Sequence, residues 1–188
     1  MIETERLILR AWQISDLEPF AELNADPDVM RYFPAPLNRE ESDNLANRFK
    51  GIIDTNEGLG FWAIELKTTS EFVGAAGLLY QADRFAFSPC TEIGWRLAKR
   101  FWHQGIAREA ATAVLDFAFN RRDLDEIVSF TSVHNIPSEN LMKRLGMVKQ
   151  GYFMHPALSA SHRLAEHVLY KITPLSMASA ATSRQLEV

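Results

Sequence analysis

The chain has 188 residues, of which 47% are hydrophobic and 23% charged, the size and composition of a globular protein with a single core. Its net charge of −4 argues against a general nucleic-acid binder, because such proteins are usually basic, and slightly favours a cationic small partner. With Cys90 as its single cysteine, the chain can form neither an intrachain disulfide nor a cysteine-based zinc site.

The same features predict a cytoplasmic protein that does not enter a membrane. A lone thiol suits a reducing compartment. The start, MIETERLILR, lacks the apolar core of a signal peptide, and the longest apolar run, residues 72–80, is far too short to span a bilayer.

The first third of the chain predicts one strand followed by helices. Residues 4–11 alternate imperfectly, as a strand does. Ser15 and Glu18 have the spacing of a capping box for a helix to about residue 24, and a short helix is indicated at 27–32. A Pro-broken loop follows at 33–37.

The middle of the chain predicts another capped helix and then a hairpin. Asn38 and Glu41 indicate a helix to about residue 55. Residues 60–67 and 71–80 read as strands joined by a short turn. Gly74 and Gly77, inside the second strand, indicate a bulge or a close backbone approach, with tight packing under a helix as the alternative.

Residues 91–120 form the segment around which the rest is organised: a strand at 91–97, a turn containing Gly105, and a helix with alanines at helical spacing. The first turn of a helix leaves its N–H groups without intrahelical partners, and the helix dipole adds positive potential there. Gly105 can adopt the positive φ that such a turn requires. The strand–Gly–helix junction therefore indicates a phosphate site.

The last third predicts a strand at 125–133, a helix at 135–146 with Pro137 in its first turn and Gly146 at its end, and closing strands at 147–155 and 165–173. Residues 1–175 are expected to form a single domain, and the small polar residues 176–188 a tail.

Two motifs resemble those of the GNAT superfamily of N-acetyltransferases. HQGIAREA is similar to its acetyl-coenzyme A loop, Q/R-x-x-G-x-G/A, with Gly105 and Ala107 at the last two fixed positions. Trp102 stands at the first fixed position, and the pair Phe101–Trp102 resembles the ribosomal-protein N-terminal acetyltransferase (RimJ/RimL-like) branch. The second motif, N-x-x-S-x-x-L-x-x-x-L-G-M, spans Asn135 to Met147.

The resemblance implies a fold class and a binding mode. The fold would be α+β: a GNAT-type three-layer α/β/α arrangement, with a mixed, mostly antiparallel sheet of six to seven strands and helices on both faces. The pyrophosphate of acetyl-coenzyme A would bind the backbone amides of His103, Gln104, Gly105, Ile106 and Ala107. The pantetheine arm would add to the strand edge at Arg96 and Leu97. Asn135 would bind the same arm, although it is equally suited to be a helix N-cap.

The catalytic residues follow from what the family reaction needs. A substrate ammonium must lose a proton, and the leaving thiolate must be stabilised. Glu92 is the candidate base, with a cross-strand ion pair as the alternative. Ser138 is the candidate support for the thiolate, because Met142 stands where many members have Tyr; Tyr152 is another possible donor. The histidines lack metal-ligand spacing, so we expect separate roles for them and no metal.

The predicted function is transfer of an acetyl group from acetyl-coenzyme A to a primary amine, at a protein or peptide N-terminus or on a small molecule, by direct attack in a ternary complex. The alternative is a non-catalytic acyl-coenzyme A-binding sensor or assembly module. The partners would be acetyl-coenzyme A and the amine, without nucleic acid or membrane, in a monomer or homodimer. The resemblance places the acceptor beside residues 26–37, 61–63 and the final hairpin.

Overall fold

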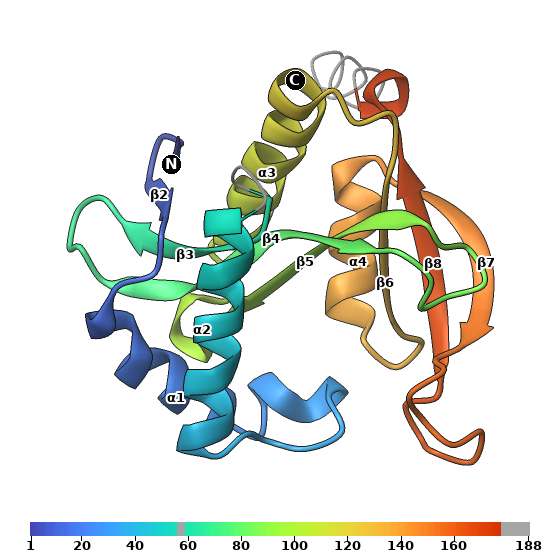
Figure 1. Ribbon diagram of the computed structural model, residues 1–188, viewed down its shortest axis with the longest axis horizontal. Helices are drawn as coiled ribbons and strands as arrows, with labels where there is room; N and C mark the ends of the chain where they lie inside the picture. The colour runs from blue at the N-terminus through green and yellow to red at the C-terminus, as the bar shows by residue number, and fades with distance from the viewer. Residues whose placement is uncertain (56–58, 178–188) are drawn as a thin grey trace. The chain divides into compact units, whose positions relative to one another are not determined.

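The computed structural model describes residues 1–55 and 59–177. Its elements, shown in Figure 1, are β1 (Ile2–Glu3), β2 (Leu7–Arg10), η1 (Ile14–Asp16), α1 (Leu17–Ala25), η2 (Val29–Tyr32), α2 (Arg39–Thr55), β3 (Phe61–Leu66), β4 (Phe72–Gln81), β5 (Cys90–Leu97), η3 (Lys99–Phe101), α3 (Ile106–Arg122), β6 (Ile127–Ser132), α4 (Ile136–Leu145), β7 (Val148–Met154) and β8 (Glu166–Ile172).

The strands pair as one mixed sheet in the order β1-β2-β3-β4-β5-β6-β8-β7. Strands β5 and β6 run parallel, whereas β1–β2, β2–β3, β3–β4, β6–β8 and β7–β8 are antiparallel. The described residues thus hold eight strands, one more than the upper limit of our prediction. The additional strand is β1: Ile2 and Glu3 pair with Leu9 and Ile8 after a turn, and two residues are too few to show a strand period.

The described residues pack as two compact units that interleave along the chain. The first contains Met1–Leu79 and Gly94–Val114, and the second contains Tyr80–Ile93 and the chain from Leu115 onward. Strand β5 and helix α3 each contribute to both units. The expected single domain over 1–175 remains a prediction.

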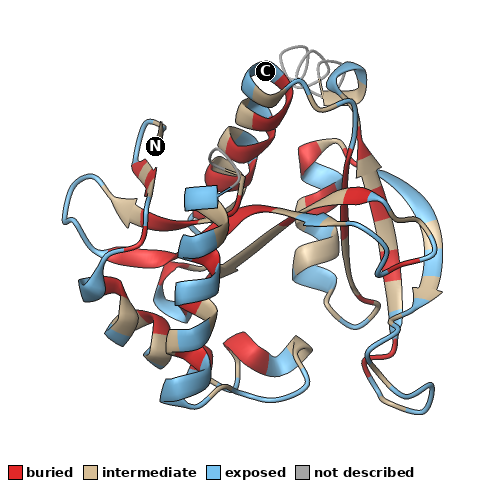
Figure 2. Ribbon diagram, viewed as in Figure 1, coloured by how far each residue is buried: buried red, intermediate tan, exposed pale blue. Residues whose placement is uncertain are grey.

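An aromatic core holds the first unit together. Trp12 lies 4.8 Å from Phe20 between ring centroids, and its indole N–H donates to the Phe61 carbonyl at 2.7 Å. Burial of large aromatic rings contributes most to such a core. Helices α1 and α2 pack on each other in this unit, and Figure 2 shows both buried and exposed residues along each of them.

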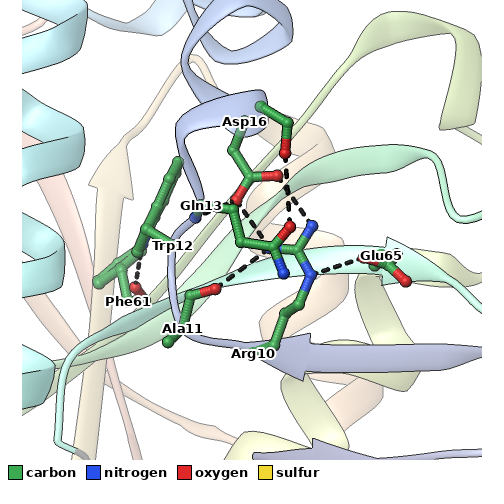
Figure 3. A network of polar contacts seen from close by, with 8 residues as sticks. Arg10, Ala11, Trp12, Gln13, Asp16, Phe61 and Glu65 are labelled. Atoms are coloured by element: carbon green, nitrogen blue, oxygen red, sulfur yellow. Dashed lines mark hydrogen bonds and ion pairs between the residues drawn. The ribbon is translucent and has the colours of Figure 1, made fainter.

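An ion-pair network fixes the chain between β2 and α1 (Figure 3). Arg10 binds Asp16 with both terminal nitrogens, at 2.7 and 2.9 Å, and Glu65 with Nε at 2.6 Å. Asp16 also accepts the Gln13 N–H at 2.8 Å. The capping box therefore lies at the start of η1, between Gln13 and Asp16, and our prediction of a box formed by Ser15 and Glu18 is wrong.

The other helix signals are confirmed. Asn38 Oδ1 accepts the Glu41 N–H at 3.0 Å, and the Glu41 carboxylate accepts the Asn38 N–H at 2.8 Å. Gly146 ends α4 with φ of 88°. At Gly77, a Cβ atom would lie 2.0 Å from the Gly60 carbonyl oxygen, so the expected close backbone approach is present.

The second unit contains the β6–β8–β7 sheet and α4. Val128 pairs with Lys171, and Phe153 pairs with His167. Tyr170 joins β8 to α4 by donating its hydroxyl to Glu139 at 2.8 Å. Most of the predicted polar tail, from residue 178, lies outside the described residues. No described helix combines the length and the hydrophobicity needed to cross a membrane.

Candidate functional site

The loop before α3 presents a row of backbone N–H groups. His103 and Gly105 both have positive φ, 60° and 76°. Among the described residues, none accepts a hydrogen bond from the backbone N–H groups of residues 103–107. Successive N–H groups in such alternating backbone conformations, at the positive end of a helix, form an anion-binding nest. The backbone conformation at His103 and Gly105 is thus compatible with the predicted pyrophosphate site, which stays a prediction.

Arg6 and Glu109 hold this loop. Arg6 Nη1 donates to the Gln104 carbonyl at 3.0 Å, and Arg6 Nε binds Glu109 at 2.7 Å. Glu109 also accepts the Arg6 backbone N–H at 2.9 Å and the Thr4 hydroxyl at 2.5 Å. Burial opposes ionisation of Glu109, but these hydrogen bonds outweigh it and lower its pKa. The same guanidinium lies 3.5 Å from the position of a Cβ built on Gly105, so it adds a positive charge to the loop.

The end of β5 is tied to the loop by Trp102. Its indole N–H donates to the Leu97 carbonyl at 3.0 Å, and the Ala98 N–H donates to Val73 at 2.9 Å. Trp102 therefore has a structural role in this loop. A pantetheine contact at Leu97 would have to use the second lone pair of that carbonyl oxygen.

Arg96 was predicted to bind the pantetheine arm through its backbone, and its side chain has a separate feature. The half-buried guanidinium donates from Nη1 to Asn24 Oδ1 at 2.6 Å and lies 4.0 Å from the centroid of the Phe33 ring. Burial lowers the pKa of Arg96 to about 10. No carboxylate is paired with it among the described residues.

Glu92, the candidate base, lies in the second unit and pairs with Val128 of β6. Its Oε2 accepts a hydrogen bond from Gln81 Nε2 at 3.0 Å. Burial raises the pKa of Glu92 to about 7, although Gln81 and the charge of Arg84 oppose the shift. The hydrogen-bonded partner of Glu92 is an amide, and among the described residues no ion pair of Glu92 is found, which was the alternative we considered. A carboxyl group with a pKa near neutrality suits general-base catalysis.

Asn135 and Ser138 lie at the start of α4. Asn135 Oδ1 accepts the Ser138 N–H at 3.3 Å, and Asn135 Nδ2 donates to the Thr131 hydroxyl at 2.9 Å. Asn135 is therefore a helix N-cap, as one of our two interpretations had it. A pantetheine contact by Asn135 would need its remaining acceptor or donor capacity.

The tyrosines near α4 differ in their availability. Tyr170 donates to Glu139, and burial together with that carboxylate raises its pKa to about 12. A phenol with so high a pKa is a poor proton donor to a thiolate. Met142 is 1% exposed and fills the core. Tyr152 is exposed, so it remains the more accessible of the two phenols.

Two histidines meet on an aromatic face of the second unit, which the sequence did not predict. The rings of His155 and His167 lie 4.9 Å apart, and Phe130 and Phe153 pack against His167. Burial, helped by the positive potential of His167 and Arg84, lowers the pKa of His155 to about 4. Over the described ranges, no three His, Cys, Asp or Glu side chains gather closely enough to hold a metal ion.

The ten predicted site residues are divided between the units. The loop residues, Arg96 and Leu97 belong to the first unit, whereas Glu92, Asn135 and Ser138 belong to the second. Sequence reasoning missed Arg6 and Glu109, and a Glu in the first turn of α3 was the one local signal that could have indicated them.

Comparisons with known sequences match this chain to one family. The profile of the acetyltransferase (GNAT) domain matches residues 6–148. The uncharacterized N-acetyltransferase YnaD of Bacillus subtilis is 28% identical over 152 residues, which cover 81% of this chain and 85% of that protein.

Solved structures show the same fold. A GNAT-family acetyltransferase from Bacillus anthracis superposes with a TM-score of 0.77 at 26% identity, covering 92% of this chain and 97% of the other. Two more distant structures agree in fold alone. Spermidine N-acetyltransferase from Vibrio cholerae, in complex with CoA and spermine, has a TM-score of 0.72 at 20% identity, with coverages of 93% and 99%. Ribosomal-protein-S5-alanine acetyltransferase from Vibrio fischeri has a TM-score of 0.68 at 20% identity, with coverages of 91% and 94%. The predicted fold class is thus confirmed apart from its strand number.

Proposed function

The chain belongs to the GNAT acetyltransferase family, and from that premise we propose that it transfers the acetyl group of acetyl-coenzyme A to a primary amine. The observation that carries the proposal is the row of N–H groups at residues 103–107, which lies inside the matched domain and has no acceptor among the described residues. The amine would belong to a protein or peptide N-terminus or to a small molecule.

Acetyl-coenzyme A binding would begin at this loop. The N–H groups would donate to the pyrophosphate, and Arg6 would add a positive charge beside them. Arg96 and Leu97 would pair through their backbones with the pantetheine arm, and Asn135 would contact it from α4.

The reaction would be a direct attack within a ternary complex. A neutral amine would form a C–N bond with the thioester carbonyl carbon, and the C–S bond would break. The nitrogen would then release a proton that neutralises the departing thiolate, so that coenzyme A leaves as the thiol. Glu92 would accept the ammonium proton, directly or through water, since its pKa near 7 lets it do so at neutral pH. Ser138 would support the thiolate. Positioning of the two substrates supplies roughly 7–11 kcal/mol in such reactions.

The finer assignment is to the ribosomal-protein N-terminal acetyltransferase branch. It rests on Phe101 and Trp102, and the structure gives Trp102 a defined role in holding the Leu97 carbonyl. This assignment goes with a cytoplasmic location, a monomer or homodimer, and no partner beyond acetyl-coenzyme A and the amine.

Release of coenzyme A thiol tests the function. Purified protein, acetyl-coenzyme A and a panel of peptides and small amines should give amine-dependent thiol release, with an acetylated amine detected by mass spectrometry. If acetyl-coenzyme A binds but no amine of the panel is acetylated, the non-catalytic binding module replaces the proposal.

A further inference from the structure

Arg96 differs from Arg10, another half-buried arginine of the first unit, in what its guanidinium binds. At Arg10, the two carboxylates of Asp16 and Glu65 receive three of the donors, and these bonds, led by that to Asp16, raise the pKa of Arg10 (Figure 3). Arg96 has no such carboxylate, and burial alone lowers its pKa. A partly buried guanidinium without a counter-ion is costly unless a ligand compensates it.

The surroundings of Arg96 hold its guanidinium in one orientation. Asn24 accepts from Nη1 at 2.6 Å and in turn donates from Nδ2 to the Ser42 hydroxyl at 2.9 Å. Asn24 and Ser42 are both fully buried, so this chain of hydrogen bonds is fixed by the packing of α1 against α2. The Phe33 ring lies 4.0 Å from the guanidinium carbon. The group is therefore preorganised although no charge holds it.

The remaining N–H donors of Arg96 are available to a ligand. A guanidinium carries five N–H groups, and one nitrogen, Nη1, is bound here. Among the described residues, no side-chain nitrogen or oxygen is both fully buried and without a hydrogen-bond partner. No hydrogen bond of Arg96 Nε or Nη2 is found among the described residues, so each of these atoms keeps some solvent exposure. A planar fork with two free nitrogens matches a carboxylate in bidentate geometry.

We propose that the Arg96 side chain binds a carboxylate carried by the acceptor amine, so that of the two acceptor kinds in the proposed function the small molecule applies, and the substrate class is amino carboxylates. The inference rests on the proposed function. Phe33, which stacks on Arg96, belongs to the 26–37 segment beside which the family resemblance places the acceptor. The carboxylate of Asp28 in this segment is occupied by Lys99 at 2.5 Å and by Arg31 at 3.1 Å, so it does not neutralise Arg96. The net charge of the chain slightly favoured a cationic partner, but the nearby guanidinium of Arg96 acts more strongly on the acceptor and favours an anionic group there.

The other anion that could reach Arg96 is a phosphate group of acetyl-coenzyme A. The two sources have separate signatures. Binding of the acceptor carboxylate changes the selectivity between amines, whereas binding of a coenzyme phosphate changes the affinity for acetyl-coenzyme A.

The test compares amino acids with their amides, which differ in the carboxylate. We expect wild-type kcat/KM to favour the acid by roughly 100-fold after correction for the neutral fraction of each amine, the usual effect of one charge-assisted pair. Arg96→Met should abolish this ratio, and Arg96→Lys, which keeps the charge without the planar fork, should retain part of it. Arg39→Met is the matched control, because Arg39 already binds Glu18 and Asp43, and its ratio should equal that of the wild type.

Three results would overturn the inference: a wild-type enzyme that treats acid and amide alike, an unchanged ratio in folded Arg96→Met, or a weaker acetyl-coenzyme A affinity as the sole effect of the substitution. The wild-type comparison needs no variant, so misfolding of Arg96→Met cannot mask the outcome. If the wild type acetylates no amine at all, the proposed function fails. Calorimetry with amino acids alone then measures whether their carboxylate binds at Arg96, and absence of binding would contradict the inference as well.

Discussion

Replacing Glu92 by Gln should slow the reaction and stabilise the protein at the same time. The substitution keeps the size of the side chain and can keep an oxygen for the Gln81 amide, which lies 3.0 Å from Glu92 Oε2. It removes the ionisable proton. A residue whose role is only structural would not couple these two effects.

The magnitude of the stability change follows from the pKa. Glu92 ionises near 7 in the folded chain against an ordinary value of 4.5, because burial disfavours the charged form. The unfolded chain therefore loses this proton first, and the free energy of unfolding falls as the pH rises from about 4.5 to about 7. Since a tenfold change in proton affinity is worth about 1.4 kcal/mol, Glu92→Gln should stabilise the fold by roughly 3 kcal/mol above pH 7 and by little at pH 4.5.

The catalytic rate of Glu92→Gln should fall, although its stability rises. We expect kcat to fall by roughly 10²–10⁴-fold near neutral pH, the usual contribution of a general base. The wild-type profile should rise through pH 7 as Glu92 loses its proton, and the variant should lack this limb. The loss should shrink at high pH, where more of the amine is already neutral. Acetyl-coenzyme A affinity should barely change.

Steady-state kinetics from pH 5 to 9, with thermal melts in the same buffers, measure both effects. If Glu92→Gln turns over normally at pH 7 while its melting temperature rises as predicted, Glu92 is a buried carboxyl without a catalytic role. If neither changes, the burial argument itself is wrong.

The contacts of Arg6 with the loop before α3, and the contact between His155 and His167, give two further predictions. Arg6→Met should weaken acetyl-coenzyme A binding at least tenfold in calorimetry, roughly the value of one hydrogen bond to a charged group, while Arg39→Met should not; equal affinities would remove Arg6 from the site. His155 protonates near 4 in the fold against its ordinary 6.5, so the unfolded chain binds the proton first and stability is lost as the pH falls from 6.5 to 4. His155→Asn, which keeps an acceptor for the Ala157 N–H, should flatten this part of a melting profile; a profile parallel to the wild type would contradict the burial of His155.

Local patterns predicted most elements because the physics of those elements is local. The box of Asn38 and Glu41, the end of α4 at Gly146 and the loop at Gly105 each depend on a few adjacent residues. The capping box before α1 was assigned to the wrong residues, because Asp16, which accepts the Gln13 N–H at the start of η1, is also held by the distant contact with Arg10.

What the sequence could not predict depends on distant residues. Arg6 and Glu109 stand 103 positions apart and meet only after β2 and α3 are placed. The ring contact between His155 and His167 follows from the β7–β8 register, which includes a shift between Lys149 and Gly151. Periodicity cannot reveal a register, so the two histidines could not be paired in advance.

Acetyl-coenzyme A binding at the loop before α3 is the central claim, and calorimetry on Gly105→Ala measures it most directly. The φ of 76° costs an Ala residue about 1–2 kcal/mol, and the strain should turn the N–H row away from its anion. Gly51→Ala is the control, because its Cβ would meet nothing within 4 Å. We predict one molecule of acetyl-coenzyme A bound by the wild type and by Gly51→Ala, and at least tenfold weaker binding by Gly105→Ala. Absence of binding by the wild type, or equal affinity in the two variants, would contradict the account.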